Sequence, residues 1–227
     1  SYLSGDKEGI WTKWFANGDR KEESNFKSGK LNGSITKWYE NGTKSEEGNY
    51  DNGKQNGKWV WYWESGIKKE VTVFIDGQQE GLWTTWYEDG TKKSERKFSN
   101  GERDSVWTTW YKDGNKKFQA TYSNGKLNGS WTSWYNGGIV KEKTGFYLDN
   151  QLDKKWTHWS ENGQKTKVVT YSNGLKNGSY MVWNNDNFKT IDGQYTQNQK
   201  DKLWTLRYND GNLKAKESYS KGEKDGK

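Results

Sequence analysis

The sequence predicts an all-β protein, built as an elongated single-sheet array of antiparallel β-hairpins that forms a twisted or curved ribbon. Three observations predict this fold. A unit of 24 residues recurs about nine times, glycine interrupts the chain about every dozen residues, and aromatic or β-branched residues fill the stretches between. A helix needs longer uninterrupted segments, so short strands joined by turns are the better assignment.

The repeats are numbered from the residue that opens each unit, which is usually glycine. All steps between openings are 24 residues, except the sixth step, which is 25. Residues 1–227 are therefore expected to form one continuous repeat array of about 18 strands with partial units at both ends, the last beginning at Gly226 and Lys227. The openings are Gly9, Gly33, Gly57, Gly81, Ser105, Gly129, Lys154, Gly178 and Lys202.

The composition explains how so polar a chain can fold. Only 29% of the residues are hydrophobic, yet 16% are aromatic, including 16 tryptophans. Disordered chains are poor in aromatic residues, whereas a repeat needs only a few large side chains packed on its neighbours. The chain has no proline, which suits paired strands, and no cysteine, which removes disulfides and thiolate metal sites. No apolar run approaches the roughly 20 residues of a membrane-spanning helix.

The first strand of each repeat carries two prominent rings, such as Trp83 at position three and Trp86 at position six. Alternation places positions three, seven and eighteen on one face of the sheet and position six on the other. The opening residue is expected to pair with the aromatic residue at position eighteen, whose ring covers the glycine. Position eighteen holds Phe26, Tyr50, Phe74, Phe98, Tyr122, Phe146, Tyr171, Tyr195 and Tyr219.

Two turns close each repeat. The first follows position seven and contains Asn-Gly or Asp-Gly, which predicts a two-residue type I′ turn with positive φ at both residues. A longer second turn, such as residues 124–128, leads into the next repeat. The extra residue of the sixth repeat is expected as a bulge within residues 144–153. The first-turn dipeptides are Asn17-Gly18, Asn41-Gly42, Asp89-Gly90, Asp113-Gly114, Asn162-Gly163 and Asp210-Gly211.

With such a first turn, position six would lie directly across from position thirteen. Position thirteen is often lysine, so cross-strand cation–π pairs are expected, each contributing roughly 0.5–1 kcal/mol when exposed. The expected pairs are Lys21 with Trp14, Lys69 with Tyr62, Lys93 with Trp86, Lys117 with Trp110, and Lys141 with Trp134.

The pattern G-x-W-x-x-W-Y-x-N-G, followed by Lys and Glu and then by F/Y-x-x-G-K, resembles the MORN-repeat variant of bacterial proteins often labelled antitoxin-like. The resemblance covers the whole chain and departs from the pattern at Ser105, Lys154 and Lys202, where the opening glycine is lost. It implies stacked hairpins in a single sheet that act as scaffolds, as protein or lipid binders, or as dimerising rods. An antitoxin role is implied by the family label alone.

No combination of residues points to catalysis, so the chain is expected to be no enzyme and to need no cofactor or metal. His158 is the single histidine and is expected to be a surface residue on a strand. No serine has the setting of a nucleophile elbow. The net charge of +7 comes from 37 basic and 30 acidic residues that are interspersed, which indicates a solvated surface and argues against nucleic acid as the partner.

The rings at position six are the candidate partner-binding residues. In one interpretation, lysine stems cover them as packing; in the other, they form an exposed ladder that meets a partner, because exposed rings in register are costly unless something covers them. Two classes of function follow: a scaffold for protein binding or self-association, or a carbohydrate- or cell-wall-binding module whose rings stack on sugars. A secreted or cell-surface location is slightly favoured over the cytoplasm. The expected contact set is Trp38, Trp86, Trp110 and Trp134.

Overall fold

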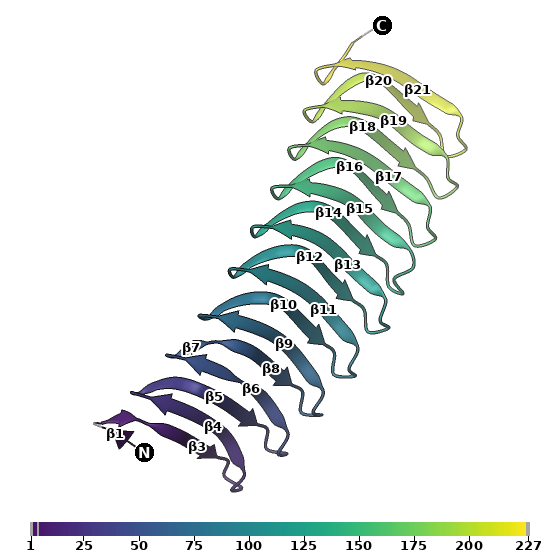
Figure 1. The fold of residues 1–227 in the computed structure, drawn as a ribbon. Helices are drawn as coiled ribbons and strands as arrows, with labels where there is room; N and C mark the ends of the chain where they lie inside the picture. Colours follow the sequence, from purple (N-terminus) through teal and green to yellow (C-terminus); the bar gives the residue numbers. More distant parts are fainter. Residues whose placement is uncertain (1, 4, 226–227) are drawn as a thin grey trace. The chain divides into compact units, whose positions relative to one another are not determined.

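The computed structural model describes residues 2–3 and 5–225, and over that part of the chain it contains 22 β-strands and no helix. The predicted all-β fold of antiparallel hairpins is confirmed. The chain divides into two compact units, Ser1–Gly114 and Asn115–Lys227. In each unit the strands lie side by side in sequence order as one open layer (Figure 1). That all nine repeats form one continuous array stays a prediction, and its tenth opening at Gly226 lies outside the described residues.

Unit 1 contains the first twelve strands. Its two-residue strands β1 and β2 pair with each other, and the sheet of the unit begins at β3. The strands are β1 (Tyr2–Leu3), β2 (Asp6–Lys7), β3 (Gly9–Trp14), β4 (Arg20–Lys27), β5 (Lys30–Trp38), β6 (Lys44–Asp51), β7 (Lys54–Gln55), β8 (Gly57–Tyr62), β9 (Lys68–Ile75), β10 (Gln78–Trp86), β11 (Lys92–Ser99) and β12 (Glu102–Trp110).

Unit 2 contains the remaining ten strands, and each described pairing is again antiparallel between sequence neighbours. Counting both units, eighteen strands have six or more residues, which is the predicted number. The strands are β13 (Lys116–Ser123), β14 (Lys126–Trp134), β15 (Lys141–Leu148), β16 (Gln151–Trp159), β17 (Lys165–Ser172), β18 (Leu175–Trp183), β19 (Lys189–Thr196), β20 (Gln199–Arg207), β21 (Leu213–Ser220) and β22 (Glu223–Lys224).

The opening residue of every repeat has positive φ. Gly9 and Gly57 begin their strands, whereas Gly81 lies inside β10 at an irregularity in the pairing with β9. The predicted pairing with position eighteen is confirmed where Gly81 lies opposite Phe98 and where Lys202 lies opposite Tyr219. In the sixth repeat this prediction was wrong, because Gly129 pairs with Tyr147 and not with Phe146. The repeats that lack the opening glycine keep the same geometry.

Replacing Lys202 by glycine is expected to stabilise the protein by up to about 1 kcal/mol. Lys202 has a φ of 61°, and the left-handed region costs a non-glycine residue roughly 1–2 kcal/mol, partly offset by the greater chain entropy of unfolded glycine. The matched reverse change is Gly81→Lys, at a φ of 71° with open space for a Cβ. Urea unfolding should move in opposite directions for the two variants; a shift in the same direction would contradict the assignment of strain.

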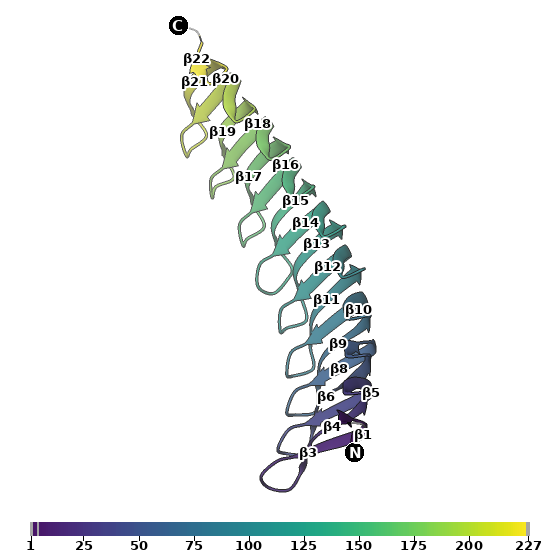
Figure 2. The same ribbon diagram turned by 90° about the vertical axis from the view of Figure 1, so that its left-hand side faces the viewer.

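The type I′ turns lie at the second turn and not, as predicted, at the first. Ser28 and Gly29 both have positive φ, at 47° and 74°, and they join β4 to β5 as a two-residue loop. At the first turn only the glycine has positive φ, as in Gly18 at 90°. There Gly18 N–H donates to the Phe15 carbonyl at 3.1 Å, which makes a three-residue loop with a left-handed third residue. Figure 2 shows these longer loops at one edge of each unit.

The side chain of the Asn or Asp explains the geometry of the first turn. Asn17 Oδ1 accepts from the Asp19 N–H at 2.9 Å, and Asp89 Oδ1 accepts from the Thr91 N–H at the same distance. This contact is the Asx turn, which holds the Asn or Asp without requiring positive φ. The prediction failed because Asn-Gly suits both kinds of loop.

The extra residue of the sixth repeat lies in the first turn and not within residues 144–153. The Tyr135 N–H donates to the carbonyl of Val140, whereas the equivalent Tyr87 donates to Thr91, one residue nearer. Gly137 and Gly138 both have positive φ in this longer loop. The insertion shifts every later residue of the repeat by one, and this shift is why Tyr147 takes the place predicted for Phe146.

The core is a row of rings on one face, called here the ring face. Position three packs against position eighteen as predicted: the ring centroids of Trp59 and Phe74 are 6.4 Å apart, and those of Trp83 and Phe98 are 5.7 Å apart. The most buried rings, Trp59, Trp156 and Trp204, are 1%, 5% and 2% exposed. Each of these rings lies over a strand glycine, and a Cβ added to that glycine would come within 2.5 Å of the ring. Among the described residues, the strand glycines with this property are Gly48, Gly145 and Gly193.

Candidate functional site

The rings at position six lie on the face opposite the ring face. The Tyr62 hydroxyl donates to Glu47. The next residue of the strand is Gly48, and a Cβ added there would point at Trp59 on the ring face. Because neighbouring residues of a strand face opposite ways, Glu47 and Tyr62 lie on the other face. Trp14, in the first repeat, is 59% exposed. The four candidate partner-binding residues are instead half-buried, so each keeps part of its ring at the surface: Trp38, Trp86, Trp110 and Trp134.

The cation over each of three candidate rings comes from position twelve of the preceding repeat. The Arg20 guanidinium carbon lies 5.1 Å from the Trp38 ring centroid. Lys92 Nζ lies 5.3 Å from the Trp110 ring centroid. In unit 2 the same arrangement places Lys116 Nζ 5.9 Å from the Trp134 ring centroid.

The cross-strand pairs predicted between positions six and thirteen were therefore wrong for most repeats. A bulge shifts the register after position five, so Trp86 pairs with Lys92 and Trp14 pairs with Arg20. Trp134 does pair with Lys141, but only because of the extra turn residue. The lysines at position thirteen instead cover the position-seven rings: Lys21 over Phe15, Lys69 over Trp63, and Lys93 over Tyr87.

Carboxylates complete the arrangement in unit 1. Arg20 lies 3.5 Å from Glu23, Lys44 lies 2.6 Å from Glu47, and Lys92 lies 2.9 Å from Glu95. Arg20 and Lys92 each complete a ring–cation–carboxylate triplet, the first with Trp38 and Glu23 and the second with Trp110 and Glu95. In the repeat between them, Lys44 and the Tyr62 hydroxyl meet at Glu47. Each exposed ion pair alone contributes little stability, so its main effect is to fix the cation over the ring.

Two pKa shifts follow from these contacts. The hydrogen bonds from Lys44 and then Tyr62 lower the pKa of Glu47 below its usual value. Burial, followed by the hydrogen bond to Glu47, raises the pKa of Tyr62 to about 12. Because the folded pKa of Tyr62 is raised, its neutral form stabilises the fold below pH 10, and this contribution is lost as the pH rises through 12.

Trp86 differs from the other candidate rings. Over the described residues, no cation lies over its ring, whereas a cation lies over each of the other three. Its backbone carbonyl accepts a hydrogen bond from Trp63 Nε1 at 3.3 Å. Trp86 is therefore the candidate with the freest ring face.

An acidic row runs along the first-turn edge of unit 1, and the sequence reasoning missed it. Glu40, Glu64 and Glu88 occupy position eight of three successive repeats, and all three are exposed. Burial raises the pKa of Tyr39, and the carboxylates of Glu64 and Glu88 raise it further. Glu40 and Trp38 together line two open hollows of about 420 and 390 Å³. The charge row therefore adjoins the ring column.

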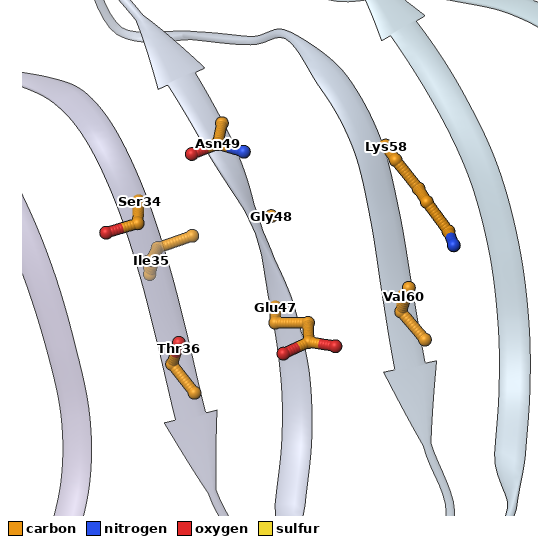
Figure 3. Close-up of a pocket in the computed structure, with 8 residues that line it drawn as sticks. All are labelled: Ser34, Ile35, Thr36, Glu47, Gly48, Asn49, Lys58 and Val60. Carbon is orange, nitrogen blue, oxygen red and sulfur yellow. The ribbon is translucent and has the colours of Figure 1, made fainter.

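A further hollow of about 290 Å³ lies over β5, β6 and β8 (Figure 3). Its charged groups are the Glu47 carboxylate, already bonded to Lys44 and Tyr62, and the exposed Lys58. No nucleophile with an adjacent base lines it. The lining residues are Ser34, Ile35, Thr36, Glu47, Gly48, Asn49, Lys58 and Val60.

The described part of the chain offers neither a metal-binding cluster nor a helix able to cross a membrane. Across residues 2–3 and 5–225, no group of three or more His, Cys, Asp or Glu residues is placed to hold a metal ion. Over the same residues, no helix has the length and apolar character needed to span a bilayer. His158 lies half-buried on the ring face of unit 2, and its pKa is lowered by burial and by Lys143 and Lys167.

Comparison with protein families finds the MORN repeat variant in four stretches: residues 7–28, 31–52, 79–100 and 103–124. These stretches cover less than half of the chain, and each carries one repeat of the 24-residue pattern. MORN repeats are non-enzymatic scaffolds that generally mediate binding to proteins or membrane lipids. No curated protein matches the chain. The chain is thus similar to the MORN repeat variant over these four stretches.

Proposed function

We propose that the chain is a non-enzymatic scaffold that binds a protein partner through the position-six rings and the adjoining acidic edge of unit 1. The observation that carries the proposal is the recurrence of position-six rings on one face of unit 1, two of them, Trp38 and Trp110, under a cation that a carboxylate holds. Tryptophan, tyrosine and arginine are the residues that usually dominate binding energy at protein interfaces. A row of such groups offers a long regular surface, which suits a macromolecule better than a small molecule.

Exposed apolar side chains on the same face support this choice. Leu82 and Val106, both at position two, are 51% and 48% exposed. They lie on the same face as the position-six rings, because positions two and six are an even number of residues apart on one strand. The extra residue of the bulge is on the partner strand, as at Lys93 on β11. Rings, aliphatic groups and paired charges together have the composition of a protein interface.

The acidic edge indicates the chemistry of the partner. Glu40, Glu64 and Glu88 repeat at the spacing of the repeats, about 10 Å apart at two strands per step. A partner segment with lysine or arginine side chains at similar spacing would complement them. An antitoxin role would be one case of this proposal, with a toxin protein as the basic partner.

A carbohydrate ligand is less well supported by the geometry. Sugars stack on free ring faces, whereas Arg20, Lys92 and Lys116 cover Trp38, Trp110 and Trp134. A protein partner can instead meet the ring edges and the cations together, as at Trp38 and Trp110 in unit 1. Glycan binding is therefore an alternative outcome of the test below.

The test compares the protein with the double variant Trp86→Ala, Trp110→Ala in capture from an extract of the source cell. A hot-spot tryptophan contributes about 2 kcal/mol or more, so affinity for the captured protein should fall at least about 30-fold. Raising the salt concentration should weaken capture as well, because exposed charges are screened. Circular dichroism and thermal unfolding check that the variant is folded.

The matched control is Trp183→Ala, which removes a half-buried position-six ring in unit 2, outside the proposed contact set. It should retain the partner. Equal retention by the folded double variant would show that the rings serve packing alone. Capture that free oligosaccharide or anionic vesicles compete away, with no protein retained, would also overturn the proposal.

A further inference from the structure

One row of side chains crosses the ring face of each unit, next to the row of rings. It is made by position five of each first strand and its cross-strand partner on the second strand. In unit 1 the row reads Lys13, Glu22, Lys37 and Glu46. The charges alternate and pair, with Lys13 3.1 Å from Glu22 and Lys37 2.6 Å from Glu46. This part of the row is electrically balanced.

In unit 2 the same row is basic. Lys143 on β15 pairs with His158 on β16, and His158 pairs with Lys167 on β17. The two lysines therefore occupy the second-strand sites that glutamates fill in unit 1. Neighbouring strands lie about 4.8 Å apart, so the three side chains emerge side by side within roughly 10 Å. The row ends at Ser133 on one side and Val182 on the other.

Lys143, His158 and Lys167 together carry more positive charge than the neighbouring carboxylate can balance. Glu142 lies 3.3 Å from Lys143 and also accepts from Ser133 Oγ at 2.9 Å. Lys167 Nζ lies 5.3 Å from the Tyr180 ring and has no carboxylate partner among the described residues. The pKa of His158 is lowered by burial, then by Lys143 and Lys167, with Glu142 opposing. One carboxylate thus faces two lysines and an imidazole.

We propose that Lys143, His158 and Lys167 form a binding site for a doubly charged oxyanion, namely a sulfate or phosphate group. The three donors stand side by side on three adjacent strands, on one side of the sheet, and each ammonium can present several N–H groups to an anion. All three side chains are half-buried and open to solvent, so Lys143 and Lys167 need only turn their ammonium groups from Glu142 and the Tyr180 ring towards the ion. The proposal rests on the replacement of the glutamates of this row by Lys143 and Lys167 in unit 2. It does not depend on the protein-binding face proposed for unit 1.

The test uses the fact that His158 is the only histidine of the chain, so its imidazole proton signals are unambiguous in NMR. Its pKa is measured in sodium sulfate and in sodium chloride at equal ionic strength. Sulfate is chosen because phosphate itself titrates near pH 6. Bound sulfate favours the imidazolium, so the pKa should rise in sulfate; one unit of rise means about tenfold tighter binding to the protonated form.

The variant Lys143→Gln, Lys167→Gln should abolish the sulfate-dependent rise and raise the pKa in chloride, because two repelling charges are gone. The matched control is Lys141→Gln, Lys165→Gln, which removes two charges from the same strands beside the position-six rings Trp134 and Trp159. It should keep the rise. Inorganic phosphate and a soluble phosphomonoester, compared above pH 7, distinguish a free ion from a group carried by a larger molecule.

Equal pKa values in sulfate and chloride would overturn the proposal. So would a sulfate-dependent rise that survives in the variant Lys143→Gln, Lys167→Gln, because the ion would then bind elsewhere. A loss of the rise in the control variant would show a general charge effect and would also contradict the site.

Discussion

Replacement of Trp59 by alanine is expected to lower the free energy of unfolding by about 3–5 kcal/mol, the range for removing a large buried ring. Trp59 is 1% exposed. Its ring meets Tyr50 edge-on at 5.1 Å and stacks on Trp61 at 5.6 Å. Aromatic pairs of this kind add about 0.5–1.5 kcal/mol each beyond the buried area. Its Nε1 also donates to the Asn49 carbonyl at 3.1 Å.

Urea unfolding followed by circular dichroism measures the effect. The control is Trp14→Ala, which removes the same side chain from a position that is 59% exposed and should change stability by about 0.5 kcal/mol or less. Because repeats interact mainly with their neighbours, hydrogen exchange should show the loss concentrated in β5, β6, β8 and β9. Similar costs for the two variants would mean that the ring face is not the core.

The sequence was sufficient to predict the strands and the ring face, because both depend on periodicity. The 24-residue recurrence placed every opening residue, and alternation correctly put Trp59 and Phe74 on one face. The turn chemistry was harder to predict. Asn17 satisfies an Asx turn and a type I′ turn equally well from sequence, and only the backbone hydrogen bonds distinguish them.

A single bulge accounts for the errors at the candidate site. The alternation of side chains along a strand was enough to place Trp86 on the face opposite the ring face. Predicting which cation lies beside a position-six ring requires the register of the two strands in the hairpin. A shift of that register by one residue puts position twelve, and not position thirteen, opposite position six. The cation over Trp38 also comes from the preceding repeat, so no pattern within one repeat could reveal it. The binding role of the four rings stays a prediction.

The signal that separates buried from half-buried tryptophans was present in the sequence and was missed. Gly48, Gly145 and Gly193 occupy the same place in three repeats, one strand before Trp59, Trp156 and Trp204. Where Thr72 stands there instead, the indole Nε1 of the following Trp83 is buried without a hydrogen-bond partner, as is Thr72 Oγ1. With Thr72 at this place, the next indole therefore lacks the hydrogen bond that Trp59 Nε1 makes.

Gly145→Ala is therefore expected to destabilise the protein by about 1–3 kcal/mol, the usual cost of overpacking a core. A Cβ at Gly145 would lie 2.1 Å from the Trp156 ring, so the ring must move and weaken its hydrogen bond to the Phe146 carbonyl. Its φ lies outside the left-handed region, so alanine suffers no backbone strain. The contact with Trp156 alone should then determine the cost.

A double-mutant cycle isolates that contact. In a Trp156→Ala background, Gly145→Ala should be neutral or stabilising by up to about 1 kcal/mol, because alanine suits a strand better than glycine. The two changes should thus show a coupling energy of more than about 1 kcal/mol in urea unfolding. Additive effects would mean that the glycine is not required by the ring, and the Gly–Trp pairs would then be a coincidence of the repeat. Coupling would establish that each such glycine determines how deeply the next tryptophan is buried.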